Sequence, residues 1–137
     1  MKILGIDYGD VRVGLAVSDI TEFLASGIGN VKITGMNNAV ELVCEKIKEH
    51  GCEKIVLGLP VNMNGSQGEK AQKIRMFGDK LKECTGLEIE YVDERLTTVM
   101  AHNFMNQTGT YGKKRKEAVD TLSAQIILQN YLDSKRR

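Results

Sequence analysis

Apolar residues in the first third of the chain recur with the spacing of β-strands. The short apolar run 3–6 ends at Asp7, and apolar residues then occupy every second position from Val13 to Val17, so that they share one face. Glycines at the joint between these two segments favour a β-hairpin. Scattered β-branched residues and glycines over 24–33 predict a third, antiparallel strand.

Helical and strand patterns alternate in the remainder of the chain. Apolar residues spaced by three and four predict a helix that Asn37 or Asn38 caps and Gly51 stops. A strand over 55–60, apolar on both faces, comes next and is followed by a loop over 61–66. A helix from about 67 to 84, closed by Gly86, then precedes a strand over 87–91 with one solvated face. The chain ends with a helix from Thr97 or Thr98 to about 107, a mobile stretch over 108–114 and a last helix over 115–133.

This order of elements predicts a single layered α/β domain over residues 1–137. Three antiparallel strands come first, and strands alternating with helices follow, which together make a mixed five-stranded sheet flanked by helices. The length of 137 residues suits one domain with a real core. Neither repeats nor linkers interrupt the pattern.

The composition favours a soluble protein of a reducing cytoplasm. No apolar run approaches the roughly 20 residues that cross a bilayer, and the first residues reach Asp7 too soon for a signal peptide. The three cysteines lack a CxxC spacing. Cys44 and Cys84 fall in predicted helices, where a small buried or half-buried residue is the better interpretation. We therefore expect no membrane association.

Charge alone does not identify a partner. The net charge is +1, but residues 111–137 carry seven Lys or Arg against three acids, a local charge of +4 that leaves −3 for the rest. A basic tail on a neutral body could contact phosphates. A solvated helix start and a frayed terminus explain the same charges, and on charge alone we favour that explanation.

Asp7 is the first candidate for chemistry. An alternating strand puts it on the same face as Ile3 and Gly5, and an aspartate on an apolar face is costly unless it is paired or bound to a metal. Gly9 allows another backbone, or a phosphate, to come close. The alternative is a turn-forming aspartate that caps the hairpin. Position alone does not separate the two interpretations.

Glu94 lies at the end of a predicted strand, inside the segment 93–98. Ligands usually bind at the carboxyl ends of strands in α/β sheets. Two alternatives stay open here. Asp93 or Glu94 could stabilise the start of the following helix through its dipole, or Glu94 could pair with Arg95.

Asp120 leads a helical face that otherwise belongs to the core. Positions 120, 124, 127 and 131 share that face, and small residues at 123 and 124 would let the helix press close to the sheet. The alternative is a first-turn aspartate satisfied by free backbone N–H groups. We favour a functional role, because residues 116 and 117 upstream already have a helical pattern.

Three carboxylates from distant parts of the chain could converge on one edge of the sheet. Oxygen ligands without a His or Cys cluster suit Mg²⁺ or Mn²⁺ rather than zinc. Two such ions, about 3.5–4 Å apart, could activate a water and stabilise the leaving oxygen in phosphodiester hydrolysis.

Four motifs stand in order along nearly the whole chain. They are Gly5–Gly9 with Arg12, Gly14, Ser18 and Asp19; Val56–Pro60 with Gly65; Asp93–Thr98; and Asp120 with Ala124, Ile127 and Leu128. In their residues and spacing they resemble the YqgF/RuvX family of ribonuclease-H-like proteins. Ser123 is a small departure, because the family usually has alanine there.

The resemblance implies a ribonuclease-H-like fold and gives catalytic, metal-binding roles to Asp7, Glu94 and Asp120. It implies that Arg95 and Thr97 orient Glu94 or meet a phosphate. The basic stretch after residue 112 lies where the family has a loop over the substrate. The substrate-binding residues that follow from the resemblance are Tyr8, Gly9, Arg12, Arg95, Thr97, Lys113 and Lys114.

The family resemblance favours processing of the 5′ end of precursor 16S ribosomal RNA, with four-way (Holliday junction) DNA as the second candidate substrate. Similarity of fold alone is weak evidence for the identity of the substrate. A monomer and a homodimer both fit.

Two other classes of protein fit parts of the sequence. The segment Gly5–Gly9 also resembles the first phosphate loop of actin-like ATPases and sugar kinases, but one domain without a second phosphate loop does not favour nucleotide binding. A non-catalytic nucleic-acid adaptor, in which the carboxylates are structural, stays open.

Overall fold

A computed structural model describes residues 1–60, 68–93 and 112–135, and for 112–120 it describes the backbone alone. The elements are β1 (Ile3–Tyr8), β2 (Arg12–Ser18), β3 (Ala25–Lys32), α1 (Met36–His50), β4 (Lys54–Leu59), α2 (Glu69–Thr85), β5 (Glu88–Asp93) and α4 (Gly112–Lys135).

The strands form one mixed sheet in the order β3-β2-β1-β4-β5. The first three strands are antiparallel neighbours, whereas β4 pairs in parallel with both β1 and β5. The predicted mixed five-stranded sheet is therefore confirmed. Strands β1, β4 and β5 run in the same direction, so their carboxyl ends meet at one edge of the sheet.

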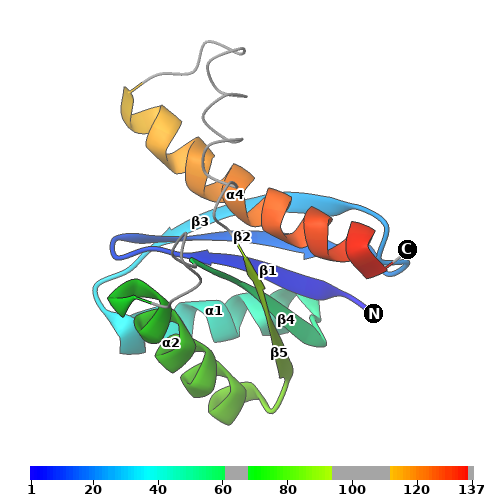
Figure 1. Cartoon of the computed structure of the whole chain (residues 1–137), viewed down its shortest axis with the longest axis horizontal. Coiled ribbons are helices and arrows are strands. Elements are labelled where there is room, and N and C mark those ends of the chain that lie inside the picture. The colour runs from blue at the N-terminus through cyan, green and yellow to red at the C-terminus, as the bar shows by residue number, and fades with distance from the viewer. Residues whose placement is uncertain (61–67, 94–111, 136–137) are drawn as a thin grey trace.

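Helices cover both faces of the sheet (Figure 1). Helices α1 and α2 lie on one face, and α4 crosses the other. Alternation along β1 divides its side chains between two cores: Leu4, Ile6 and Tyr8 belong to the core under α1 and α2, and Ile3 belongs to the core under α4. Every residue of β4 is buried, as predicted for a strand covered on both sides.

The two helices that precede β4 and β5 end where the sequence predicts. Gly51 and Gly86 follow them in the left-handed conformation, with φ of 66° and 70°. The predicted side-chain cap of α1 is wrong. The helix begins at Met36 after Gly35, and Asn38 accepts a hydrogen bond from the backbone N–H of Thr34 (2.9 Å) within the first turn.

Helix α4 begins three residues before its predicted start. Residues 112–114, predicted as part of a mobile stretch, are helical. The two lysines there favour helix, although the segment has no apolar period that would predict one. Helix α2 begins at Glu69 and not at about 67. The predicted loop 61–66, the predicted helix 97–107 and residues 108–111 lie outside the described residues.

Within the described part of the chain, no helix combines the length and apolar character needed to span a membrane.

Candidate functional site

Asp7 lies within the ladder between β1 and β2 and not in the turn that follows. It pairs with Gly14, and Gly14 pairs in turn with Asn30 of β3, so a row of three residues crosses the sheet. The turn is closed by a hydrogen bond from the N–H of Gly9 to the carbonyl of Arg12 (3.0 Å). Asp7 is therefore not a turn aspartate. It is half-buried on a regular strand.

The side chain of Asp7 belongs to the face covered by α4. Ile3 lies in the core under α4, and strand alternation gives the same face to Gly5 and Asp7. On β2, Ala16 lies in this core too, which assigns Arg12 and Gly14 to the same side. The predicted grouping of Asp7 with Ile3 and Gly5 is confirmed.

Helix α4 comes close to the sheet at Gly5 and Gly27. A Cβ atom added at Gly5 would lie 2.7 Å from Cβ of Leu128 and 3.2 Å from the carbonyl oxygen of Ala124. A Cβ added at Gly27 would lie 2.7 Å from a methyl carbon of Thr121. At Gly5 the approach leaves no room for a Cβ atom. The small residues Ser123 and Ala124, which were predicted to let this helix press against the sheet, are buried.

The row that contains Asp7 leads to the turn of α4 that contains Asp120. The side-chain amide of Asn30 donates a hydrogen bond to Oγ1 of Thr121 (3.4 Å), the residue after Asp120 in the helix. Neighbouring strands lie about 4.8 Å apart, so the backbones of Asp7 and Asn30 are separated by about 10 Å. The side chain of Asp120 is outside the described residues, and a meeting of the two carboxylates stays a prediction.

The third predicted carboxylate follows the last residue of β5. Leu59 pairs with Asp93, so β4 and β5 end side by side at the edge where β1 also ends. Glu94, Arg95 and Thr97 come after Asp93 and lie outside the described residues. Lys113 and Lys114 belong to the first turn of α4, and their side chains are not described.

Tyr8 and Gly9 make contacts within the protein itself. The ring of Tyr8 is 5% exposed and stacks on Phe77 of α2 with centroids 4.4 Å apart. Burial raises the pKa of Tyr8, and the nearby charge of Lys73 opposes that shift. A Cβ at Gly9 would meet the Arg12 carbonyl at 2.7 Å, so the backbone that approaches this glycine is that of the turn. Substrate contact by Tyr8 stays a prediction that this packing does not favour.

Sequence reasoning missed two polar residues beside Asp7. Asn30 completes the row described above, and Lys32, which is exposed, pairs across the sheet with the predicted phosphate ligand Arg12. Their register could not be counted from the sequence, because an irregularity between Leu15 and Ala16 shifts the pairing of β2 with β3. With the register known, strand alternation alone identifies both.

The described residues supply one carboxylate, that of Asp7, to the predicted metal site. Asp7 is the one predicted metal ligand whose side chain the structure describes, and its oxygens suit Mg²⁺ or Mn²⁺. Gly14, its partner across the ladder, places no side chain next to it. No group of three potential ligands from His, Cys, Asp and Glu occurs among the described residues. A complete metal site would therefore need Glu94 and Asp120.

Relatives with 41–44% identity align with almost the whole chain. A relative from Caldanaerobacter subterraneus is 41% identical over 99% of both chains, and one from Ruminiclostridium cellulolyticum is 44% identical over 97% of this chain and 94% of its own. Both are named for a pre-16S rRNA nuclease activity.

The fold matches that of two resolvases solved with Holliday junction DNA. RuvC of Thermus thermophilus aligns with a TM-score of 0.60 at 16% identity, over 99% of this chain and 96% of its own. The fowlpox virus resolvase aligns with a TM-score of 0.63 at 15% identity, over all of both chains. At these identities the likeness shows a shared fold.

The profile of a protein family described as "RuvX: Holliday junction resolvase" matches residues 1–134, almost the full length. The chain therefore belongs to the RuvX family.

Proposed function

We propose that this protein is a metal-dependent nuclease that hydrolyses phosphodiester bonds, with Asp7, Glu94 and Asp120 as its catalytic carboxylates. The proposal rests on the position of Asp7. It is half-buried on the face under α4, in a row of residues that leads to the turn containing Asp120. Membership of the RuvX family and relatives named as nucleases support the same activity.

The arrangement of β5 supports the inclusion of Glu94. Val92 packs against the core under α4, and Glu90 accepts a hydrogen bond from Tyr131 of α4, so alternate residues of β5 face that helix. Continued alternation would give the same face to Glu94. The three carboxylates would hold Mg²⁺ or Mn²⁺, two ions in the catalytic state, which would activate a water and stabilise the leaving oxygen.

Cations at the same edge would bind the phosphates of the substrate. Arg12 shares the face of Asp7, and Lys32 lies directly across the ladder from it. Arg95 and Thr97, together with Lys113 and Lys114, are proposed to complete this surface. Arginine suits the role because its planar fork can donate two hydrogen bonds to one phosphate.

We infer that RNA is the substrate and that the protein acts on the 5′ end of precursor 16S rRNA in the cytoplasm. The relatives named for that activity are 41–44% identical to this chain, whereas the structures that hold Holliday junctions are 15–16% identical. Four-way DNA is the second candidate, because the family is described as one of Holliday junction resolvases.

The test compares Asp7→Asn with Asp10→Asn. Asp10 is the matched control, because it lies three residues away in the exposed turn and pairs with Lys73 (3.2 Å). With Mn²⁺ present, we expect Asp7→Asn to lose about 100-fold or more of the cleavage rate on single-stranded precursor RNA or on four-way DNA, and Asp10→Asn to keep it. Equal rates for wild type and Asp7→Asn would refute the mechanism.

Thermal unfolding gives a second readout that does not depend on the substrate. Because Mn²⁺ would relieve the repulsion among carboxylates, it should raise the melting temperature of the wild type and raise that of Asp7→Asn less. A wild type that binds RNA tightly but cleaves neither substrate and gains no stability from Mn²⁺ would favour the non-catalytic adaptor.

A further inference from the structure

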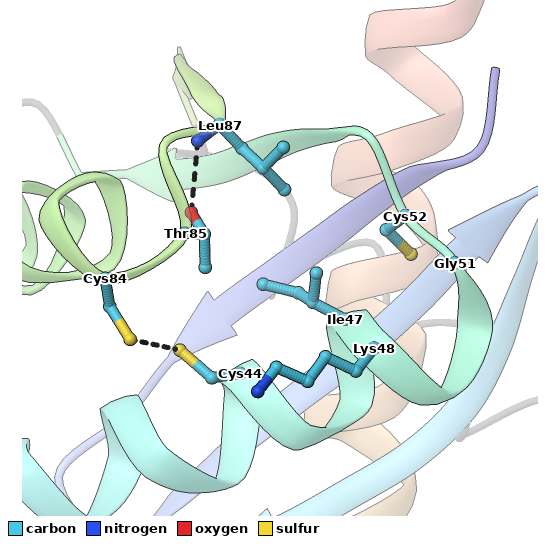
Figure 2. A pocket seen from close by; sticks show the side chains of 8 residues that line it. All are labelled: Cys44, Ile47, Lys48, Gly51, Cys52, Cys84, Thr85 and Leu87. Atoms are coloured by element: carbon cyan, nitrogen blue, oxygen red, sulfur yellow. Dashed lines mark hydrogen bonds between the residues drawn. The ribbon is translucent and has the colours of Figure 1, made fainter.

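Two cysteines from different helices are in contact on the side of the sheet away from α4. The thiol of Cys44 in α1 donates a hydrogen bond to the sulfur of Cys84 in α2, with the two Sγ atoms 3.3 Å apart (Figure 2). Forty residues separate them in the sequence, so the contact depends on the packing of α1 against α2.

The two sulfurs differ in their access to solvent. Cys44 is buried, and Cys84 is exposed. A cavity of about 400 Å³ opens beside the pair, and a second cavity of about 570 Å³ between α1 and α2 is also lined by Cys84. A small water-soluble reagent can therefore reach Cys84 directly, whereas it can reach Cys44 only past Cys84 or through the first cavity.

The pair does not belong to a metal cluster within the described part of the chain. Cys52 lines the same cavity but lies apart from the contact, as Figure 2 shows. No set of three potential ligands forms there among the described residues. Burial, and then the hydrogen bond to Cys84, raise the pKa of Cys44 to about 11, so Cys44 is protonated at neutral pH. Lys48, which also lines the cavity, opposes that shift.

We propose that Cys44 and Cys84 form an oxidative modification site, in which a hydroperoxide converts the pair into a reversible disulfide between α1 and α2. The exposed sulfur of Cys84 takes one oxygen from the hydroperoxide and becomes a sulfenic acid, with release of water or an alcohol. The sulfur of Cys44 then attacks the sulfur of Cys84, and the displaced hydroxide leaves as water with the proton of Cys44. The two thiols supply the two electrons that reduce the peroxide.

The geometry favours closure of this bond over further oxidation. A disulfide requires an S–S distance of about 2.05 Å, so the sulfurs must approach by a little more than 1 Å. Rotation of two small side chains, with slight adjustment of α1 against α2, can supply that movement. A sulfenic acid at Cys84 would have its resolving thiol already in contact, which is the usual arrangement of a reversible thiol switch.

The experiment treats the full-length reduced protein with hydrogen peroxide. We expect the chain to lose the mass of two hydrogen atoms, one of its three thiols to stay titratable after denaturation, and peptide mapping to find one link, between Cys44 and Cys84. The link closes a loop of about 40 residues and should raise the melting temperature by about 10 °C, a gain that dithiothreitol reverses.

Two single variants keep this test falsifiable. Cys52→Ala should form the same link and leave no titratable thiol, whereas Cys84→Ser, at an exposed position, should fold normally and form no link. The proposal is overturned if peroxide drives Cys84 of the wild type to sulfinic or sulfonic acid without a link. A link between two chains, with Cys44 still reduced, would overturn it as well.

Discussion

The strands present large apolar side chains to α1 and α2, whereas the strand residues that face α4 include small ones such as Gly5, Ala16 and Gly27. On the first face, Ile6, Leu57 and Phe77 are fully buried in one continuous core. On the second face, Gly5 and Ala124 occupy the closest approach of helix to strand. The large side chains bury apolar area, while the small ones fix how near α4 can lie.

Strand β1 contributes to both faces, so residues expected to matter for stability and for the proposed activity alternate along it. Successive residues of β1 point to opposite faces, so Ile6 belongs to the large core and Asp7 to the face under α4. A core made of large apolar residues disfavours an unpaired charge, whereas in the proposed function the face that carries Asp7 would hold ions at its edge. The two faces should therefore respond differently to substitution.

The largest effect is expected from Ile6→Ala. Ile6 is fully buried under α1 and α2, and its truncation leaves a cavity between the sheet and both helices. We expect the free energy of unfolding to fall by about 2–5 kcal/mol, measured by urea denaturation. Because α4 keeps its contacts, nuclease activity of the folded fraction should be retained.

Ile6→Val is the matched control for that cavity. It removes one methylene group and should cost about 0.5–1.5 kcal/mol. If Ile6→Ala abolished cleavage while the protein stayed folded, the functional separation of the two faces would be wrong.

The next effect in size is expected from Gly5→Ala, which adds volume where Ile6→Ala removes it. The new methyl group would lie 2.7 Å from Cβ of Leu128 and 3.2 Å from a backbone oxygen, so α4 must move away. We expect a loss of about 1–3 kcal/mol, again by urea denaturation. The displaced helix should also lower the cleavage rate, in contrast to Ile6→Ala.

A smaller side chain opposite Gly5 provides the control. In the double variant Gly5→Ala with Leu128→Gly, the Cβ atom that the new methyl group would meet at 2.7 Å is absent, and the combined loss should be smaller than the sum of the two single losses. Additive losses would mean that Gly5 and Leu128 do not touch in solution.

Periodicity predicted most of this fold because each face repeats a simple pattern. The alternation over Val13–Val17 and the fully apolar strand β4 identify faces without knowledge of the tertiary structure. Gly51 and Gly86 mark helix ends through their own conformational preference. The start of α4 was missed because lysines carry helix propensity but no apolar period, and the cap of α1 was missed because Gly35 caps it without a side chain.

The candidate site was less predictable, since it depends on register and not on period. Asp7 could be identified from the sequence because a carboxylate is unusual on a strand face that is otherwise apolar. Asn30 and Lys32 did not stand out, because their places opposite Gly14 and Arg12 follow from a pairing that is shifted by the irregularity opposite Leu15 and Ala16. The contact between Cys44 and Cys84 was missed for a similar reason, as it depends on how two helices pack.

A moderate, pH-dependent effect is expected from Glu90→Gln, where β5 meets α4. Glu90 accepts hydrogen bonds from Tyr131 (2.7 Å) and from the nearly buried ammonium of Lys54 (3.0 Å), and these hold the pKa of Glu90 below its usual value. Because Glu90 is about half exposed, solvent screens the pair, and we expect a loss of about 1 kcal/mol at pH 7.

The sign of the pH dependence follows from the lowered pKa of Glu90. Its charge stabilises the folded state above the unfolded pKa of about 4.3, and that contribution is lost as the pH falls through the folded pKa. The gap between wild type and Glu90→Gln should therefore close between about pH 5 and pH 3 in urea denaturation. Glu88→Gln, whose carboxylate is 3.9 Å from Lys54 and more exposed, should show a smaller gap. A gap that does not change with pH would contradict the assignment.

The smallest effect is expected from Ser123→Ala on the buried side of α4, and it should be a gain in stability. Ser123 is 1% exposed, and its hydroxyl finds no hydrogen-bond partner in the structure as described. Removing an unpaired buried hydroxyl and adding a better helix former should raise the free energy of unfolding by about 1 kcal/mol. Ser134→Ala on the same helix is the control, because that hydroxyl is hydrogen-bonded to the carbonyl of Tyr131 (2.7 Å) and its loss offsets the gain in propensity. A loss of stability in Ser123→Ala would mean that this hydroxyl is hydrogen-bonded in solution.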